Sequence, residues 1–349
     1  MSSLKPRIGF RTTGDAHIGL GHLIECLNVA RYLKKHYDVS SLFIVDYDTV
    51  QHSDIKEIGL PLCRLPSDID FHADALGTLR ILSRWGIQLL VTNLRDVRDN
   101  YIQALKQEGI TVICIDEWGN KRLQPDVVIN GSVVEDWHRY DSNSKKMACY
   151  FGPQFMIMAD VFAAYHTRHK TLSGNLPNVL VSMGGADPSG ATLRVMEALG
   201  HLSPKIRKTI VIGPAFQHQE ALAELVVRLK GSNFNIVRTP DNIASLFFSA
   251  DLAISAGGNT LYELACVGTP AIVLFEYEHE RVQGETFQQL GSAVKLGRGT
   301  DVPLEVISQA IVSLLNDPGQ WTAMSRRGKS IVDGRGVVRV CDIIVTHLE

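Results

Sequence analysis

A short glycine-rich stretch, Ile18-Gly19-Leu20-Gly21-His22, combines an anion-binding backbone with a side chain that can accept a proton. Gly19 and Gly21 let the backbone pass close to a ligand. The free N–H groups at the start of the following helix, expected to run to about residue 35, favour an anion. The positive end of that helix disfavours imidazolium, so His22 in its first turn is expected to be neutral. We hypothesise that His22 is a general base facing a phosphorylated substrate; the alternative is an ordinary turn with a polar cap.

Two glycine-rich turns in the second half of the chain are candidate phosphate sites. Gly257-Gly258-Asn259-Thr260 lies between an apolar strand and a helix, so its N–H groups and the Thr260 hydroxyl could hold a diphosphate. Glu263, one turn into that helix, could accept hydrogen bonds from both hydroxyls of a ribose. Gly184-Gly185 occupies the equivalent place after an earlier strand. In the alternative interpretation the glycines only allow close packing, and Glu263 only complements the helix dipole.

The elements that must position these residues are short apolar strands that alternate with helices. Strands that are apolar throughout indicate a parallel sheet covered on both faces, and ligands bind beyond the carboxyl ends of such strands. Asn93 and Asp116 follow strand ends and could line one crevice with residues 19–22, although turn and cap chemistry also explains them. The expected strands are residues 8–11, 41–45, 89–92, 112–116 and 127–130, then 179–183, 208–213, 234–237, 252–256 and 270–275.

The pattern predicts an α/β protein with two Rossmann-like parallel-sheet domains that face each other across a cleft. A polar segment with Gly and Pro but no apolar period separates the two halves, which is typical of a linker. We expect an N-terminal domain at residues 1–165 that carries His22, a linker at 166–178, and a nucleotide-binding domain at 179–335. The last helix, residues 336–349, could close either domain.

Composition excludes several classes of function. The chain has 349 residues, 45% of them hydrophobic and 21% charged, with a net charge of −2, which argues against a dedicated nucleic-acid binder. Six widely spaced cysteines without a Cys-x-x-Cys pair favour reduced thiols over a disulfide or zinc framework. The sequence has no apolar run of membrane-spanning length and no signal-peptide pattern. We therefore expect a cytoplasmic protein without stable membrane insertion, and the oligomeric state stays open.

Further motifs follow these turns in a distinctive order: Ile115-Asp116-Glu117, then residues 125–130, 151–155, 182–187 and 254–264. Together they resemble the nucleotide-sugar hydrolases of the pseudaminic acid pathway, to which spore-coat polysaccharide proteins are similar, and which are relatives of the MurG-type GT-B glycosyltransferases. The resemblance implies a GT-B fold with UDP held mainly by the C-terminal domain. It implies that His22 activates a water, which attacks the anomeric carbon and displaces UDP with inversion, without a metal or other cofactor.

The chain departs from that family at positions on the sugar side and at the end of the UDP site. By our alignment, Thr13 replaces Asp, Glu25 replaces Arg, Asn93 and Arg95 replace Asp and Tyr, Ala159 replaces Arg, and His279-Glu280 replaces Asn-Gln. We expect substrate contacts from the residues now at these places: Thr13, Asn93, Arg95, His279 and Glu280. Arg95 could meet a carboxylate or phosphate, or simply lie exposed.

The acidic segment 276–280 also invites a metal interpretation. It follows a strand and is expected to be a solvated loop, so we favour contacts of His279 and Glu280 with ribose or sugar hydroxyls over a metal site.

The expected function is hydrolysis of a UDP-sugar, such as a deoxy-amino sugar, in surface-polysaccharide or nonulosonate-type biosynthesis. One alternative is an inverting GT-B glycosyltransferase, in which another acceptor replaces water. A second alternative is a non-catalytic protein that binds a nucleotide sugar.

Overall fold

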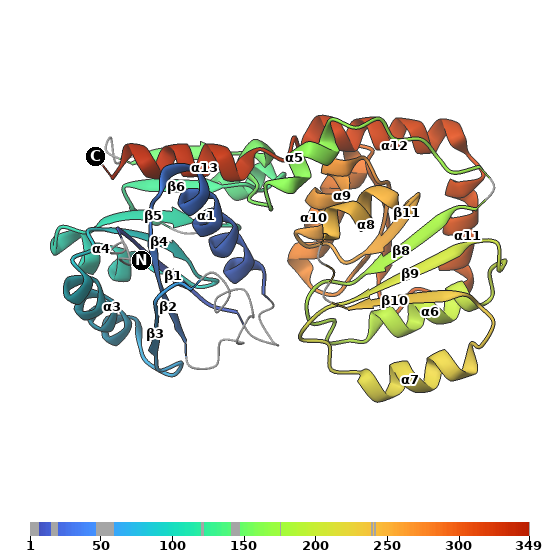
Figure 1. Cartoon of the computed structure of the whole chain (residues 1–349), viewed down its shortest axis with the longest axis horizontal. Helices are drawn as coiled ribbons and strands as arrows, with labels where there is room; N and C mark the ends of the chain where they lie inside the picture. Colours follow the sequence, from blue (N-terminus) through green and yellow to red (C-terminus); the bar gives the residue numbers. More distant parts are fainter. Residues whose placement is uncertain are drawn as a thin grey trace. The chain divides into compact units, whose positions relative to one another are not determined.

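The computed structural model describes residues 7–14, 20–46, 59–119, 122–140, 147–174, 176–238, 240 and 242–348. The chain divides into two compact units. The first comprises residues 1–160 and 335–349, and the second comprises residues 161–334. Figure 1 shows the elements of each unit.

The first unit is a parallel sheet with helices on both faces. Its strands are β1 (Ile8–Thr12), β2 (Ser41–Asp46), β3 (Leu62–Leu65), β4 (Leu89–Asn93), β5 (Thr111–Ile115), β6 (Val127–Asn130) and β7 (Ala148–Phe151). Its helices are α1 (Gly21–Tyr37), α3 (Phe71–Trp85), α4 (Asp99–Gln107), η1 (Glu135–His138), η2 (Pro153–Phe155) and α13 (Gly336–Thr346). One sheet face packs against α1 and α13, and the other packs against α3 and α4.

The strand order of this sheet determines which residues meet at its carboxyl edge. The order is β3-β2-β1-β4-β5-β6-β7, so it reverses between β1 and β4, the position where open α/β sheets bind ligands. Register pairs Thr12 of β1 with Asn93 of β4. Because α1 begins nine residues after β1 ends, the first turn of α1 returns to the same edge as Asn93. The five strands expected in this half are all present.

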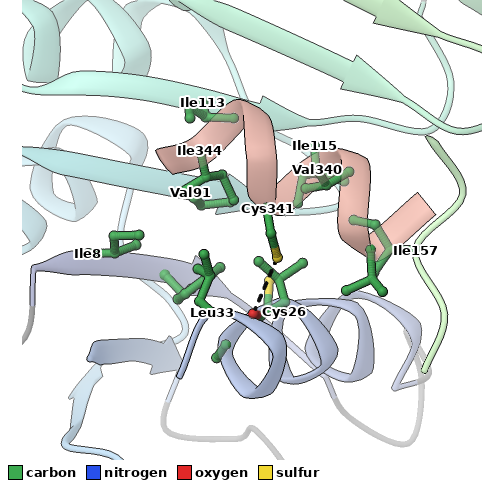
Figure 2. Packing of buried hydrophobic residues seen from close by; sticks show 14 of the residues in the cluster. Ile8, Cys26, Leu33, Val91, Ile113, Ile115, Ile157, Val340, Cys341 and Ile344 are labelled. Carbon is green, nitrogen blue, oxygen red and sulfur yellow. Dashed lines mark hydrogen bonds between the residues drawn. The ribbon is translucent and has the colours of Figure 1, made fainter. Parts of the chain in front are cut away.

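The C-terminal helix α13 packs on α1 and completes the first unit. Its apolar side, including Val340, Cys341 and Ile344, is buried against α1 and the sheet (Figure 2). The Cys341 thiol donates to the carbonyl oxygen of Val29 on α1, with sulfur and oxygen 3.7 Å apart. The end of the chain is therefore part of the first core, a choice that the sequence left open.

We expect Ile344→Ala to lower the stability of the first unit by about 2–5 kcal/mol, because it removes fully buried methyl groups and leaves a cavity. Hydrogen exchange measured by mass spectrometry checks this: protection should fall in peptides of residues 1–160 and not in those of 161–334. Val306→Ala, at a side chain 40% exposed on the second unit, is the matched control. Unchanged exchange in the first unit would contradict the docking of α13.

The second unit repeats the architecture of the first. Its strands are β8 (Asn178–Ser182), β9 (Arg207–Ile212), β10 (Phe234–Arg238), β11 (Leu252–Ser255), β12 (Ala271–Phe275) and β13 (Ala293–Arg298), in the order β10-β9-β8-β11-β12-β13. Its helices are α5 (Val161–His166), α6 (Ala191–Gly200), α7 (Gln219–Arg228), α8 (Ile243–Ser249), α9 (Thr260–Val267), α10 (Glu278–Gln289), α11 (Leu304–Leu315) and α12 (Pro318–Ile331). All described strand pairs in both sheets are parallel.

The segment expected to be a linker is instead attached to the second unit. His166 Nδ1 lies 3.0 Å from the carbonyl oxygen of Cys266, and the N–H of Ser173 donates to Asp251 at 2.8 Å. The Lys170 ammonium donates to the carbonyl oxygen of Phe248, at the carboxyl end of α8. The boundary between the units thus falls between residues 160 and 161, five residues before the expected one, because polar side chains in the segment find backbone partners. Among the described helices, none is long and apolar enough to cross a bilayer.

Candidate active site

His22 lies in the first turn of α1 and is almost buried, with 8% of its surface exposed. The chain reaches this turn from the carboxyl end of β1, and within the described residues no side chain caps the helix start. Gly21 is the first residue of α1, whereas Gly19 lies outside the described residues. His22 therefore stands at a helix start, as the sequence predicted.

A chain of hydrogen bonds connects His22 to two buried polar side chains. His22 Nδ1 is 2.8 Å from Oδ1 of Asn93, at the end of β4. The Asn93 amide group donates through Nδ2 to Oε2 of Glu25 at 2.8 Å. Asn93 is 1% exposed and Glu25 4% exposed, so both bonds are shielded from water. His22 and Glu25 share one side of α1 because they are three residues apart, and sheet register brings Asn93 to them.

Glu117, two residues after the end of β5, lies near the same histidine. Its Oε1 atom is 4.0 Å from His22 Nδ1. One ligand atom from each of His22, Glu25 and Glu117 lies within 4.8 Å of the others, a donor set that suits a divalent transition metal. A cation bound at Nδ1 would have to displace Asn93 from that nitrogen.

The remaining expected residues of this edge have separate surroundings. Thr13 is 6% exposed, directly after β1. The Arg95 guanidinium lies over the Trp118 ring, with its central carbon 5.4 Å from the ring centroid, so a π-face holds it beside the segment that follows β5. Asp116 accepts hydrogen bonds from the Tyr140 hydroxyl at 2.7 Å and from the Gly119 N–H at 3.2 Å. Asp116 therefore has the turn role that the sequence offered as its alternative.

In the second unit, the turn between β11 and α9 is held against α10. Gly257 accepts a hydrogen bond from the Gln283 side chain, whose oxygen in turn accepts from the Tyr262 hydroxyl at 3.0 Å. A Cβ at Gly257 would lie 2.3 Å from the carbonyl oxygen of Glu280, so only glycine fits. The N–H groups of Gly258 and Thr260 have no acceptor in the described part of the chain. These donors at the start of α9 suit an anion.

Glu263 lies one turn into α9 and is half-buried. None of the described residues donates a hydrogen bond to its carboxylate, and burial raises its pKa to about 7. A carboxylate held in this way has unused acceptor capacity that hydroxyl donors of a ligand could fill. Its surroundings therefore fit a hydrogen-bonding role better than the alternative in which it only complements the helix dipole.

The turn after β8 differs from the turn after β11, which corrects one expectation. Gly184 adopts a left-handed φ of 85°, and the carbonyl oxygen of Gly185 accepts from the N–H of Ala215 at 3.0 Å. The following helix α6 begins only at Ala191, and its N–H groups at residues 191 and 192 bond to the Asp187 carboxylate at 2.8 and 2.9 Å. Because Asp187 already supplies an anion, the start of α6 is not free to hold a diphosphate.

The acidic segment at 276–280 is not the loop that was expected. Helix α10 begins at Glu278, and Oε2 of Glu280 accepts from the N–H groups of Glu276 and Tyr277 at 2.8 and 3.2 Å. Glu280 thus caps its own helix, and burial raises its pKa. The His279 ring stacks on that of Tyr277, with centroids 5.6 Å apart. A glutamate at the third position of a helix is a capping signal, which the sequence interpretation missed.

Sequence reasoning also missed the relation between Glu25 and His22. Glu25 appeared only as a departure from the family pattern, although its spacing of three residues from His22 on a predicted helix indicated a shared side. The approach of Glu117 had no comparable signal, because Glu117 and His22 are 95 positions apart and meet only through strand order.

The two sheets, with donor-rich helix starts at their carboxyl edges, define a protein of the GT-B fold. The structure of MurG from Acinetobacter baumannii superposes with a TM-score of 0.70 at 16% identity, covering 98% of this chain and 99% of that one. Spinosyn rhamnosyltransferase SpnG in complex with thymidine diphosphate gives a TM-score of 0.64 at 15% identity, covering 96% and 100%.

The chain is similar to the spore coat polysaccharide biosynthesis protein SpsG of Bacillus subtilis (strain 168). The two are 26% identical over 343 residues, which is 97% of each chain. The resemblance predicted from the motifs is thereby confirmed, as is the predicted fold class. No family model matches the chain.

Proposed function

We propose that this protein hydrolyses a nucleotide sugar, most simply a UDP-sugar, to free sugar and nucleoside diphosphate, with His22 as general base. The observation that carries this proposal is the chain His22–Asn93–Glu25, in which a nearly buried imidazole at a helix start is oriented by an amide that a carboxylate holds. An imidazole oriented by a second polar group is the usual arrangement of a general base.

The second unit is proposed to bind the nucleotide. The N–H groups of Gly258 and Thr260 at the start of α9, which have no acceptor among the described residues, would donate to the diphosphate. The carboxylate of Glu263, which has no donor in that part of the chain, would accept bonds from the ribose hydroxyls. Asn259 precedes α9 in the same turn. The backbone of the Gly184-Gly185 turn is proposed to pass close to the nucleotide without binding its diphosphate. The N–H groups at the start of α6, which follows this turn, are already bonded to Asp187.

The proposed step needs one base and a positioned water. His22 takes a proton from the water, whose oxygen forms a bond to the anomeric carbon. The bond from that carbon to the diphosphate oxygen breaks, and the electron pair leaves with the diphosphate, inverting the anomeric centre. The diphosphate is a weak base whose charge the N–H donors of α9 would stabilise, so little acid catalysis is required.

The relatives support a role for the sugar product in polysaccharide biosynthesis, since the SpsG protein carries that description. We propose a deoxy-amino sugar as the substrate's sugar. The altered residues Thr13, Arg95 and His279 are then expected to select a sugar different from that of the pseudaminic acid pathway, whereas Asn93 is too buried to contact it.

Transfer to an acceptor other than water is the second candidate. The fold is shared with a rhamnosyltransferase, which favours glycosyl transfer from a nucleotide sugar. Arg95, stacked over Trp118, would then contact a carboxylate or phosphate of the acceptor. A third candidate, a protein that binds a nucleotide sugar without turning it over, has no structural observation in its favour.

A panel of UDP-, TDP-, GDP- and CMP-sugars in water enriched in ¹⁸O tests these candidates together. Hydrolysis by the proposed route places ¹⁸O on the anomeric carbon of the free sugar and none on the nucleoside diphosphate. Turnover that requires an added acceptor supports the transferase. Tight nucleotide binding without turnover under either condition contradicts both catalytic proposals.

We expect removal of divalent cations with EDTA to leave turnover within about twofold, because the proposed step uses a neutral imidazole and backbone donors rather than a Lewis acid. The measurement is kcat before and after chelation, with metal content verified by mass spectrometry. Loss of activity that Mn²⁺ or Zn²⁺ restores would instead support a cation held by His22, Glu25 and Glu117.

A further inference from the structure

The orientation of the Asn93 amide follows from its neighbours. Its Nδ2 atom faces two acceptors, Oε2 of Glu25 at 2.8 Å and the carbonyl oxygen of His22 at 3.4 Å. A backbone carbonyl oxygen can only accept, so the NH₂ group of Asn93 belongs on this side. The amide oxygen must then face His22 Nδ1, 2.8 Å away.

An amide oxygen also only accepts hydrogen bonds, so His22 Nδ1 must be the donor in that contact. A neutral imidazole carries one proton, and with this proton on Nδ1 the lone pair of Nε2 is available. We infer that Asn93 and Glu25 are positioning residues that hold His22 as its Nδ1–H tautomer, with Nε2 as the proton-accepting atom. This inference rests on the proposed function for its catalytic consequence, although the tautomer itself can be observed without any turnover.

The burial of Asn93 and Glu25 favours one tautomer of His22 over the other. A histidine side chain in water favours the opposite tautomer, with the proton on Nε2, which would leave the lone pair facing Asn93 and unable to reach a water. Asn93 and Glu25 are both nearly inaccessible to solvent, so water cannot replace either partner. The Asn93 amide oxygen accepts from His22 without carrying a full charge. The Glu25 carboxylate bonds to Asn93 and not directly to His22.

The charges around His22 indicate what happens when it takes a proton. Glu25 on α1 and Glu117 after β5 are carboxylates close to the ring among the described residues, so a positive charge that forms on His22 during the proposed step would have negative charges nearby. Cys26 adjoins Asn93, but burial raises the pKa of its thiol far above the usual range, so it stays neutral. Glu25 acts through the Asn93 amide and Glu117 across 4.0 Å, so neither removes the lone pair of the resting base.

Nitrogen NMR of protein labelled with ¹⁵N-histidine tests the tautomer directly. Signals of His22 are identified by their loss in His22→Gln. We expect the resting enzyme to show a protonated Nδ1 and an unprotonated Nε2. A protonated Nε2 in the resting enzyme would overturn the inference, whatever the activity.

Variants then test whether Asn93 sets the tautomer. Asn93→Ala is made in a Glu117→Ala background, so that the neighbouring carboxylate cannot accept the Nδ1 proton in its place. Relative to the Glu117→Ala parent, we expect His22 to change to the Nε2–H tautomer and kcat to fall by about 10²-fold or more, while the Kd of UDP is unchanged. Retention of the Nδ1–H tautomer would contradict the role of Asn93.

A paired exchange separates positioning from simple packing. Asn93→Asp alone puts two carboxylates in contact and should lower kcat about tenfold or more. Adding Glu25→Gln restores a donor–acceptor pair at the original net charge, with the direction of the hydrogen bond reversed, and keeps an acceptor facing His22 Nδ1, so kcat should recover to within about tenfold of the parent with the Nδ1–H tautomer present. Failure of this rescue in a folded double variant would overturn the inference. The expected tautomers without turnover of any nucleotide sugar would uphold it and contradict the proposed function.

Discussion

Replacing His22 with glutamine is expected to lower kcat by about 10²–10⁴-fold and to leave the Kd of UDP within about threefold. Glutamine supplies an amide N–H donor in place of the imidazole N–H, but it cannot take a proton from water. The diphosphate is proposed to be bound by residues of the second unit, which this substitution does not touch. Release of nucleoside diphosphate in a coupled assay and calorimetric titration of UDP measure the two quantities.

His22→Ala serves as the second variant and should lower kcat at least as much. It leaves Asn93 Oδ1 buried without a donor, which destabilises the first unit by about 1–3 kcal/mol, so its folding must be checked. His72→Ala, at an exposed position on α3, is the matched control and should behave as the parent does. A folded His22→Gln protein with kcat within threefold of the parent would refute the general-base role.

Replacing Glu263 with glutamine is expected to have two opposite effects: weaker nucleotide binding and greater stability of the free protein at pH 8. The free carboxylate is half-buried without a hydrogen-bond donor among the described residues, and its pKa is raised from 4.5 to about 7. The folded state therefore binds more protons than the unfolded state between these values, and stability falls as pH rises from about 4.5 through 7. Neutral glutamine avoids this loss.

Thermal unfolding at two pH values measures the stability effect. We expect the midpoint of Glu263→Gln to lie about 2–4 °C above that of the parent at pH 8, and the two to converge near pH 4.5, where the parent carboxyl is protonated. Glu305→Gln is the matched control, because Glu305 is an exposed acid in the first turn of α11 in the same unit. If Glu263 only complemented its helix dipole, its replacement would destabilise the protein at pH 8, as that of Glu305 should slightly.

The affinity effect is measured by titration with UDP and with 2′,3′-dideoxy-UDP. Loss of a charged acceptor for ribose hydroxyls should weaken UDP binding about 10- to 100-fold in Glu263→Gln. The dideoxy ligand lacks those hydroxyls, so it should bind the parent and the variant with similar Kd. An equal loss of affinity for both ligands would show that Glu263 does not contact the ribose.

The central strands were predictable, whereas three of the four edge strands were not. β4, β8 and β11 are buried on both sides and contain runs of apolar residues, which identify strands of a parallel sheet without any knowledge of neighbours. β3, β7 and β13 lie at sheet edges and are only partly buried. Their mixed composition resembles that of loops, and hydrogen bonding to a neighbouring strand, which sequence does not display, is what makes them strands.

The candidate site shows a similar division. Gly257, Gly258 and Glu263 are close in sequence, so a strand–turn–helix pattern was sufficient to predict their proximity. The partners of His22 come from different strands, and the capping roles of Asp187 and Glu280 depend on which backbone groups each carboxylate reaches. The α6 start is an example: a helix start was visible in the sequence, but its occupation by Asp187 was not.

The sequence by itself determined the α/β class, the repeated Rossmann-like pattern and the position of His22 at the start of a helix, because each depends on residues within one or two adjacent elements. Only the tertiary structure decided that α13 completes the first core, that the segment after residue 160 belongs to the second unit, and that Asn93, Glu25 and Glu117 surround His22. Those contacts join residues up to 312 positions apart. They are fixed by strand order and by packing of whole helices, which depend on the free energy of the complete fold rather than on any local pattern.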